Sequence, residues 1–225
     1  KQRWFPGFAD GSLISAIAMT EPGTGSDLAG MSTTAKRDGD DFIVNGAKTF
    51  ITGGINADLV IVAARTSPAG DNRRHGLSLI VVENGMKGFE RGRNLDKLGL
   101  KSSDTAELFF DKVRVPAANV LGTVDEGFSM LGRNLSQERM SIAITGVANA
   151  KAALRITKDY VQERKVFGTT VASFQNTKFS LADCATEIQA AQSMVDQAVL
   201  ALDAGELTPA DAAKVKLFCT ELQGR

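Results

Sequence analysis

The sequence predicts an α+β protein with several domains, in which an antiparallel β-sandwich or barrel is followed by an antiparallel helical bundle. Two observations support this prediction. Before Pro116, turn signals separate short runs of β-branched and aromatic residues, which is typical of antiparallel sheets. After Pro116, alanine is abundant, no proline occurs until Pro209, and apolar residues recur at helical spacing. We therefore expect a β-domain at residues 12–120 and a helical domain at residues 121–225.

The first expected strand is the apolar segment 13–19, which runs into the loop Thr-Glu-Pro-Gly-Thr-Gly-Ser-Asp at residues 20–27. Pro22 and the two glycines favour a tight, rigid turn. Backbone N–H groups and hydroxyls in such a loop can hold an anion or the polar edge of a cofactor. From these residues alone, a plain turn between strands is the alternative.

Further strands follow from turn signals and apolar runs. Asp38-Gly39 and Asn45-Gly46 each predict a two-residue hairpin turn, with a short strand at residues 41–44 between them. Residues 59–64 and 77–82 have the composition of buried strands, and residues 107–115 form the last expected strand. A linker at residues 117–126 then leads to the helices.

The helical part contains an apolar stripe and clear helix ends. The stripe recurs every seven positions, at Leu181, Ile188, Val195 and Leu202, and is widened by Ala185 and Val199. Gly205 is expected to cap this helix. Thr208-Pro209-Ala210-Asp211 predicts the start of another helix, with a capping hydroxyl and an acid three residues later. Because the stripe needs apolar cover, a bundle follows.

Composition excludes several classes of function. The 225 residues are 43% hydrophobic, which is typical of a soluble globular protein, and 26 basic residues balance 26 acidic ones. This balance argues against nucleic-acid binding. The apolar runs are too short to span a bilayer, and no signal peptide is apparent. Cys184 and Cys219 have no second cysteine or histidine at ligand spacing, so we expect neither a metal site nor a disulfide.

Several motifs in order resemble the acyl-CoA dehydrogenase family. Residues 19–27, Met-Thr-Glu-Pro-Gly-Thr-Gly-Ser-Asp, resemble its flavin-binding signature, and so do the surrounding residues 18–30. The resemblance continues at Phe50-Ile51-Thr52, at residues 99–105 and 160–168, and at Phe174-Gln175. Residues 75–79, 82–89 and 104–110 are most similar to the long-chain branch. The resemblance implies that residues 1–11 end an N-terminal helical domain and that the chain is part of a longer protein.

The resemblance implies FAD as the cofactor. The residues implied to line the flavin are Ile17, Ala18, Met19, Thr20, Gly25 and Ser26 in the first segment, and Phe50, Ile51 and Thr52 in the second. Met19 and Thr20 would face the pyrimidine edge, where a hydroxyl and an N–H group stabilise negative charge during reduction. Thr52 would lie near the redox-active nitrogen. Without the resemblance, Phe50 is equally well explained as a core aromatic.

The resemblance also implies a site shared between subunits. Arg164, Phe167 and Gln175 match residues that reach the adenine-diphosphate part of FAD in a neighbouring subunit. We therefore expect a homo-oligomer, in the form of a tetramer built as a dimer of dimers. Without the resemblance, Arg164 is the solvated end of a helix.

The catalytic base is implied to be Glu138, in the motif Ser-Gln-Glu-Arg-Met near the expected start of a helix. Two alternatives stay open: a surface charge favoured by the helix dipole, and a base supplied by a glutamate outside this chain. Ser26, Phe128, Gln137 and Arg139 are the expected substrate-binding residues. His75 lies in a polar loop, and we expect it to be solvated rather than catalytic.

The function implied is FAD-dependent oxidation of an acyl-CoA to its trans-2-enoyl-CoA, with an electron-transfer flavoprotein as the acceptor. One alternative is an oxidase or monooxygenase of the same superfamily, and fold alone does not separate these. Another is a non-catalytic module that binds flavin or acyl-CoA. The expected location is the bacterial cytoplasm, or the mitochondrial matrix for a eukaryotic protein.

Overall fold

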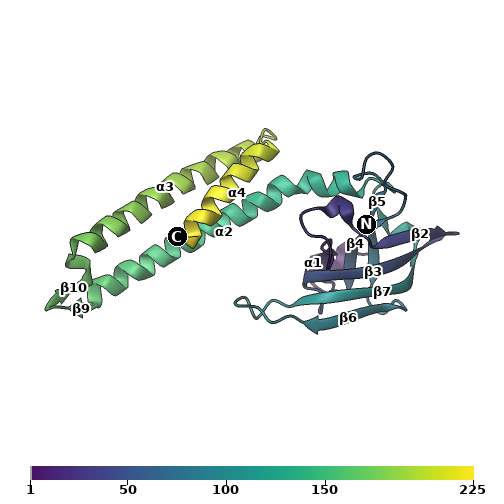
Figure 1. Ribbon diagram of the computed structural model, residues 1–225, viewed down its shortest axis with the longest axis horizontal. Helices are drawn as coiled ribbons and strands as arrows, with labels where there is room; N and C mark the ends of the chain where they lie inside the picture. The colour runs from purple at the N-terminus through teal and green to yellow at the C-terminus, as the bar shows by residue number, and fades with distance from the viewer. Residues whose placement is uncertain (1) are drawn as a thin grey trace. The chain divides into compact units, whose positions relative to one another are not determined.

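The computed structural model describes residues 2–225 and contains two compact units, one extending to Leu131 and the other spanning Gly132–Arg225 (Figure 1). The first unit is built mainly of strands and the second of helices, so the predicted α+β class is confirmed. The predicted segment 1–11 begins at Lys1, which lies outside the described residues. The remainder of that segment includes α1 (Phe5–Asp10), which ends at Gly11 with φ 77°.

The first unit contains a sheet of eight strands. These are β1 (Ser15–Ala18), β2 (Thr34–Asp38), β3 (Asp41–Thr52), β4 (Leu59–Arg65), β5 (Leu77–Glu83), β6 (Phe89–Asn94), β7 (Thr105–Pro116) and β8 (Val120–Leu121). Their order is β6-β7-β3-β2-β4-β5-β8, with β1 paired to β4. Short 3₁₀ turns lie at Leu28–Gly30 and Ala117–Asn119 in this unit, and at Val171–Ser173 in the second unit. The predicted strands at 59–64, 77–82 and 107–115 are confirmed.

Two features of the sheet differ from the prediction. Strand β1 pairs with β4 in parallel, as does Thr34 of β2 with Arg65, so the sheet is not wholly antiparallel. This is possible because the β2–β3 hairpin intervenes and lets the chain return in the same direction. Strand β6 was not predicted, because its sequence Phe-Glu-Arg-Gly-Arg-Asn has one large apolar residue and its positions are exposed or half-buried at the edge of the sheet.

The Asp38-Gly39 hairpin is confirmed, since β2 and β3 pair in antiparallel register with Asp38 opposite Asp41. The second predicted turn is wrong, because Asn45-Gly46 lies inside β3. There the register shifts from Val44–Val113 to Gly46–Phe110, which places one extra residue on β7. A local turn signal is overridden here by the long pairing of β3 with β7.

One core holds the first unit together. The inward side chains of β3 and β7 pack with those of β4 and β5, as in a sandwich; fully buried members include Val44, Leu108, Val62 and Ile80. A smaller cluster joins the first turn of α2 (Gly127–Glu163) to β5, with Phe128 packed against a buried group that includes Leu77 and Leu79. The sequence placed the domain boundary at residue 120, whereas the first compact unit extends to Leu131, which belongs to this cluster.

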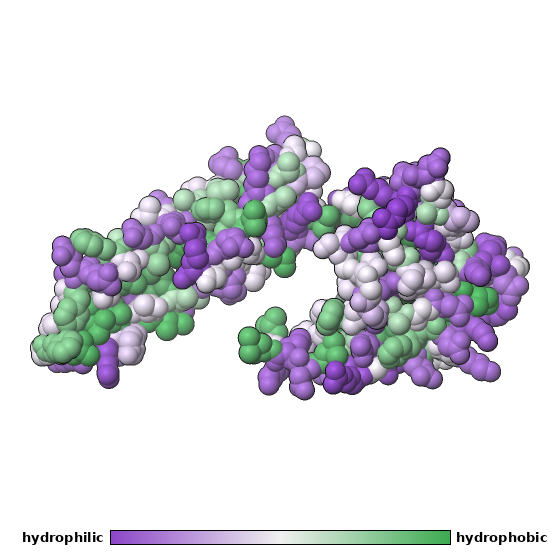
Figure 2. Space-filling model, in the orientation of Figure 1, coloured by the Kyte–Doolittle hydropathy of each residue, from purple (hydrophilic) through white to green (hydrophobic). Residues whose placement is uncertain are grey.

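The second unit consists of most of α2, a β9–β10 hairpin (Lys165–Val166 and Thr169–Thr170), α3 (Gln175–Asp203) and α4 (Pro209–Gly224). The predicted helix ends are confirmed. Gly205 follows α3 with φ 72°, and the Thr208 hydroxyl accepts a hydrogen bond of 3.1 Å from Asp211 N. Figure 2 shows apolar surface on these helices, where exposed apolar residues include Phe179, Leu200 and Leu217.

The predicted stripe on α3 is confirmed in part. Ile188 and Val195 are buried against α2 and α4, and Leu202 packs beside them. Ala185 and Val199, which were predicted to widen the stripe, are exposed. The buried face is centred on the side of Ala191 and Ala198, since these small residues allow the close approach of the neighbouring helices.

We expect Gly46→Ala to destabilise the fold. A methyl group at Gly46 would collide with the backbone and side chain of Thr33, and φ there is 150°. The expected loss is about 2 kcal/mol in the free energy of unfolding. Gly132→Ala is the control, because no atom lies within 4 Å of the added group in helix α2. That change should stabilise by about 0.5–1 kcal/mol. Urea unfolding checks both values, and equal stability of the two variants would contradict the account.

Candidate functional site

The loop at residues 19–27 lies against the C-terminal end of β3. Thr49 N donates a hydrogen bond of 2.9 Å to Thr20 O, and Lys48 Nζ donates one of 2.9 Å to Met19 O. Within the loop, Glu21 and Thr24 exchange backbone hydrogen bonds of 2.8 and 3.1 Å, which close the turn at Pro22-Gly23. The structure therefore brings together the two segments that the sequence assigned to one cofactor.

A buried ion pair connects this loop to the strand. The side chains of Glu21 and Lys48 are 3% and 0% exposed, and Glu21 Oε1 lies 2.9 Å from Lys48 Nζ. Oε1 also accepts a hydrogen bond of 2.9 Å from Thr33 N, while Oε2 accepts bonds of 2.7 Å from Ser32 N and Ser32 Oγ. The carboxylate is thus paired and fully hydrogen-bonded, which buried charges require.

Sequence reasoning missed both members of this pair. One signal was available for Lys48, since it follows Phe42 and Val44 at inward positions of β3, where a lysine needs a partner. No signal in the sequence named that partner, because Glu21 lies in a loop 27 residues away.

The environment keeps Glu21 ionised. Burial by itself would raise the pKa of Glu21, but hydrogen bonds from Thr33, Ser32 and Lys48 outweigh it and lower the pKa from 4.5 to about 2. For Lys48, burial is the largest influence and lowers its pKa, whereas the Glu21 carboxylate opposes that change. The two charges cancel inside the protein, so removing either one would leave the other uncompensated.

Phe50 is held in an uncommon conformation. Its φ is 58°, and its side chain is 67% exposed. It lies where the register shifts from Lys48–Leu108 to Ile51–Ala106, so that β3 has one extra residue. A bulky residue at positive φ is strained and persists only where its surroundings hold it. The alternative that Phe50 is a core aromatic is wrong, because the bulge directs it outward.

The other predicted flavin residues divide by exposure. Ile17 is 40% exposed, whereas Ala18 and Ile51 are 0% and 3% exposed, so the last two present little more than backbone. Thr20 is half-buried, and Thr52 is exposed. Buried and exposed side chains alternate along β1 and along the C-terminal end of β3, and this alternation accounts for the division.

The loop and strand end fit a planar ring with polar edges. Across residues 2–225, the hydroxyls of Thr20, Ser26 and Thr52 make no hydrogen bond, whereas the nearby Thr24 hydroxyl donates one to Gly30 O. A side-chain carbon added at Gly25 would meet nothing within 4 Å. Free hydroxyls, an exposed aromatic ring and open space above glycine together suit an isoalloxazine.

Three predicted residues lie around the hairpin between α2 and α3. Phe167 and Gly168 form its turn with φ of 51° and 79°, which is a type I′ geometry. Phe167 is 96% exposed and meets Phe174 edge to face, with ring centroids 6.4 Å apart. Arg164 O accepts a hydrogen bond of 2.8 Å from Val171 N, and Gln175 begins α3. The second unit therefore presents Arg164, Phe167 and Gln175 together.

Glu138 lies on an exposed face of α2 in the second unit. The helix begins at Gly127, so Glu138 is about three turns inside it and not near its start, as the sequence suggested. The helix dipole is weak at that depth, so it gives no reason for a carboxylate here. Leu135 and Ile142 are 39% and 50% exposed and share its face. In the described part of the chain, the carboxylate has no hydrogen bond or ion pair.

The residues beside Glu138 differ in their surroundings. Gln137 is exposed, whereas Arg139 is half-buried and donates a hydrogen bond of 3.4 Å from Nη1 to Pro209 O at the start of α4. Arg139 therefore joins two helices of the second unit. Its predicted role in substrate binding stays a prediction, as does that of Gln137.

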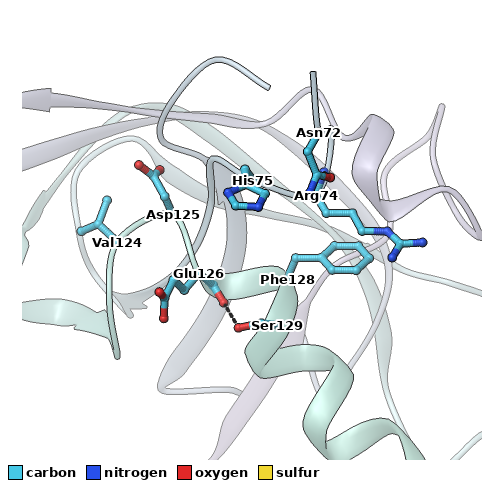
Figure 3. A pocket seen from close by; sticks show the side chains of 8 residues that line it. All are labelled: Asn72, Arg74, His75, Val124, Asp125, Glu126, Phe128 and Ser129. Carbon is cyan, nitrogen blue, oxygen red and sulfur yellow. Dashed lines mark hydrogen bonds between the residues drawn. The ribbon is translucent and has the colours of Figure 1, made fainter. Parts of the chain in front are cut away.

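A cleft of about 620 Å³ lies in the first unit at the start of α2 (Figure 3). It is lined by Asn72, Arg74, His75, Val124, Asp125, Glu126, Phe128 and Ser129. The Arg74 guanidinium carbon lies 5.5 Å from the centroid of the Phe128 ring. Phe128 was a predicted substrate residue, but sequence reasoning did not place His75 here. The charged residues Arg74, Asp125 and Glu126 were the signal that could have suggested a polar cleft here.

Asp125 fixes the entry to that helix. Its carboxylate accepts hydrogen bonds of 2.6 Å from Thr66 Oγ1 and 2.7 Å from Ser67 Oγ, and its backbone N–H donates one of 2.8 Å to Ser78 Oγ. The backbone of Asp125 has φ 72°. The entry to the helix is therefore fixed by these bonds, and the cleft carries charges of both signs, since Asp125 and Glu126 line it together with Arg74.

Among residues 2–225, no helix is both long and apolar enough to cross a membrane. The same residues contain no group of three or more histidine, cysteine, aspartate or glutamate side chains placed to hold a metal ion. Cys184 is an exposed free thiol and Cys219 a buried one.

Comparison with known proteins identifies relatives of both units. Residues 16–113 match the acyl-CoA dehydrogenase middle domain, and residues 125–225 match the acyl-CoA dehydrogenase C-terminal domain. The long-chain specific acyl-CoA dehydrogenase of Sus scrofa mitochondria is 46% identical over 99% of this chain and 52% of its own length. The chain thus spans about half the length of the curated relatives it matches.

Two solved structures of the same family are also similar to this chain. An acyl-CoA dehydrogenase from Geobacillus kaustophilus is 48% identical with a TM-score of 0.97, covering 99% of this chain and 59% of its own. A glutaryl-CoA dehydrogenase from Mycobacterium smegmatis, in complex with FADH2, is 33% identical with a TM-score of 0.91, covering 99% of this chain and 56% of its own.

We expect the Glu21–Lys48 pair to give the fold a distinct pH dependence. The pKa of Glu21 is about 2 in the folded protein against an ordinary value of 4.5. A depressed carboxyl pKa stabilises the fold fully above 4.5, and this stabilisation is lost as the pH falls from 4.5 towards 2. The loss should approach about 3 kcal/mol. The stability of Glu21→Gln should lack this dependence on pH. The difference in the free energy of unfolding between the parent and Glu21→Gln should therefore shrink as the pH falls from 4.5 towards 2. A constant difference would show that Glu21 is not held as described.

Proposed function

The chain belongs to the acyl-CoA dehydrogenase family, and from this premise we propose that the whole protein uses FAD to oxidise an acyl-CoA to its trans-2-enoyl-CoA. One observation carries the proposal: the bonds from Lys48 and Thr49 set Met19 and Thr20 beside the outward-facing Phe50 and Thr52. This arrangement has the aromatic surface and free hydroxyls that a flavin ring requires. The FADH2 complex of a relative supports the choice of cofactor.

In this proposal, FAD supplies the acceptor for the hydride that leaves the substrate's β-carbon. The chain's own residues prepare that transfer. Thr20, with its free hydroxyl, would stabilise negative charge at the pyrimidine edge, and Thr52 could donate a hydrogen bond to the ring. Phe50, from its strained position on β3, would offer its aromatic side chain to the flavin. Because hydrogen bonds from Lys48 and Thr49 fix the backbone of this loop, little of it needs to rearrange as charge develops.

Glu138 is the residue of this chain that we propose as the base for the α-proton. Its carboxylate is exposed and unpaired within the described residues, and apolar Leu135 and Ile142 flank it on the same face. A carboxylate without an ion pair can accept a proton, and neighbouring apolar side chains can contact an acyl chain. This face of α2 has both features. A glutamate outside this chain is the competing assignment.

We propose that the cleft beside α2 holds part of the coenzyme A group. Arg74 can pair with a phosphate and Phe128 offers an aromatic face to the adenine, while Asp125 and Glu126 place carboxylates in the same lining. Ser26, which is exposed in the flavin loop, would meet the acyl part.

We further propose that the protein is a homotetramer with shared sites. Phe167 is 96% exposed at φ 51°, so the hairpin holds an aromatic ring in solvent at a cost in backbone strain. A ligand in a second subunit, reached by Phe167 together with Arg164 and Gln175, would explain that arrangement. An electron-transfer flavoprotein is the proposed acceptor of the electrons.

We expect Glu138→Gln to slow flavin reduction by acyl-CoA about 10²-fold or more. The amide keeps the shape of the side chain but accepts no proton, so FAD content should be unchanged. Anaerobic stopped-flow mixing of the FAD-loaded whole protein with acyl-CoAs of several chain lengths measures the rate. Glu221→Gln, an exposed glutamate on α4, is the control and should react at the parent rate.

Two results would overturn parts of this assignment. Reduction of Glu138→Gln at the parent rate would give the role of base to a glutamate outside this chain. Rapid reoxidation of the reduced parent in air would favour an oxidase over a dehydrogenase.

A further inference from the structure

The buried pair of Glu21, in the loop, and Lys48, on β3, connects the two proposed flavin segments. We propose that Lys48 is a positioning residue for the flavin: its ammonium group holds the Met19 carbonyl in place, and Glu21 cancels the charge that this requires. The inference rests on the proposed function, since it names two residues that prepare the FAD site without touching the reacting atoms.

The geometry assigns the positioning role to Lys48. The residue lies on β3 four positions before Thr52, and its Nζ donates bonds of 2.9 Å both to Met19 O and to Glu21 Oε1. The adjacent Thr49 N donates to Thr20 O. Hydrogen bonds from two successive strand residues therefore set residues 19–21 of the loop, while Phe50 and Thr52 extend from the same strand. A shift of the loop relative to the strand would break all of them.

The burial of the pair gives it an electrostatic consequence. Both side chains are almost fully buried, so a charge left there would be poorly screened by water. Met19 and Thr20, to which Lys48 and Thr49 bond, are the residues assigned to the flavin edge that becomes negative on reduction. An uncompensated carboxylate would therefore oppose reduction, and an uncompensated ammonium would favour it.

Stability alone gives a weak reason for this pair. Buried ion pairs often stabilise a fold no more than apolar residues of the same volume. A neutral side chain could also fill the space occupied by Lys48. A neutral apolar residue, however, cannot donate a hydrogen bond to the Met19 carbonyl. A lysine alone could donate this bond but would add a buried positive charge, whereas the Lys48–Glu21 pair donates the bond and adds no net charge.

The test compares variants of the FAD-loaded whole protein that separate the hydrogen bond from the charge. Lys48→Met removes the bond to Met19 O and leaves the Glu21 carboxylate uncancelled. The double variant Lys48→Met/Glu21→Gln removes the same bond but leaves no charge. Arg114→Met is the matched control, because it removes two exposed ion pairs, to Asp38 and Asp41, at the other end of β3. The measurements are the Kd for oxidised FAD and the two-electron midpoint potential.

We expect both Lys48 variants to bind oxidised FAD at least about tenfold more weakly, since both lose the bond to Met19 O. Lys48→Met alone should weaken reduced FAD a further tenfold, which lowers the two-electron potential by about 30 mV. In the double variant the potential should return to that of the parent, while the affinity stays low. Arg114→Met should change neither quantity.

Parent-like affinity in Lys48→Met would overturn the positioning role, and equal potentials in the single and double variants would overturn the role of charge. If Lys48→Met does not fold, Glu21→Gln replaces it and is expected to give a higher potential than the double variant; equal values would again overturn the inference. A parent that binds no FAD would refute the proposed function itself. A parent that binds FAD, with variants that show no change, would refute this inference alone.

Discussion

The buried pair of Glu21 and Lys48 is the interaction on which the site depends. It places two charges where water does not reach, and it persists because every oxygen of the carboxylate has a donor: Lys48, Thr33 and Ser32. Since Lys48 also bonds Met19 O, the same pair sets the loop against β3. The position of the glycine-rich loop is therefore set by its bonds to β3. Pro22 and its neighbours account separately for the tight turn within the loop.

Backbone strain occurs at both groups of predicted cofactor residues. Phe50 and Phe167 have φ of 58° and 51°, and both side chains are exposed. Phe50 is held by the bulge between β3 and β7, and Phe167 by a two-residue hairpin turn. Each case costs free energy that the adjacent regular structure must offset. An exposed aromatic side chain held at such a cost is well explained by a ligand that it contacts.

Local patterns predicted much of the fold. Buried strands such as β4 and β5, the Asp38-Gly39 turn and the cap at Thr208 all depend on neighbouring residues, and all were found. The failures depend on residues distant in sequence. Asn45-Gly46 continues as strand because β7 pairs with it, and the partner of Lys48 lies in a loop. The expected place of Glu138 near a helix start was wrong for a different reason: the linker at residues 117–126 already implied a helix from residue 127, about three turns before Glu138. Motif resemblance named the candidate site residues, and the structure shows which contacts hold the loop and the end of β3 together.

A crystal structure of the FAD-loaded whole protein tests the central claim most directly. The account predicts that the isoalloxazine lies between residues 19–20 and residues 50–52, with Phe50 against the ring at positive φ and Lys48 Nζ still bonded to Met19 O. A flavin bound elsewhere would contradict it. So would a Met19 carbonyl released from Lys48 with the flavin in this position, because the buried pair would then not determine the site.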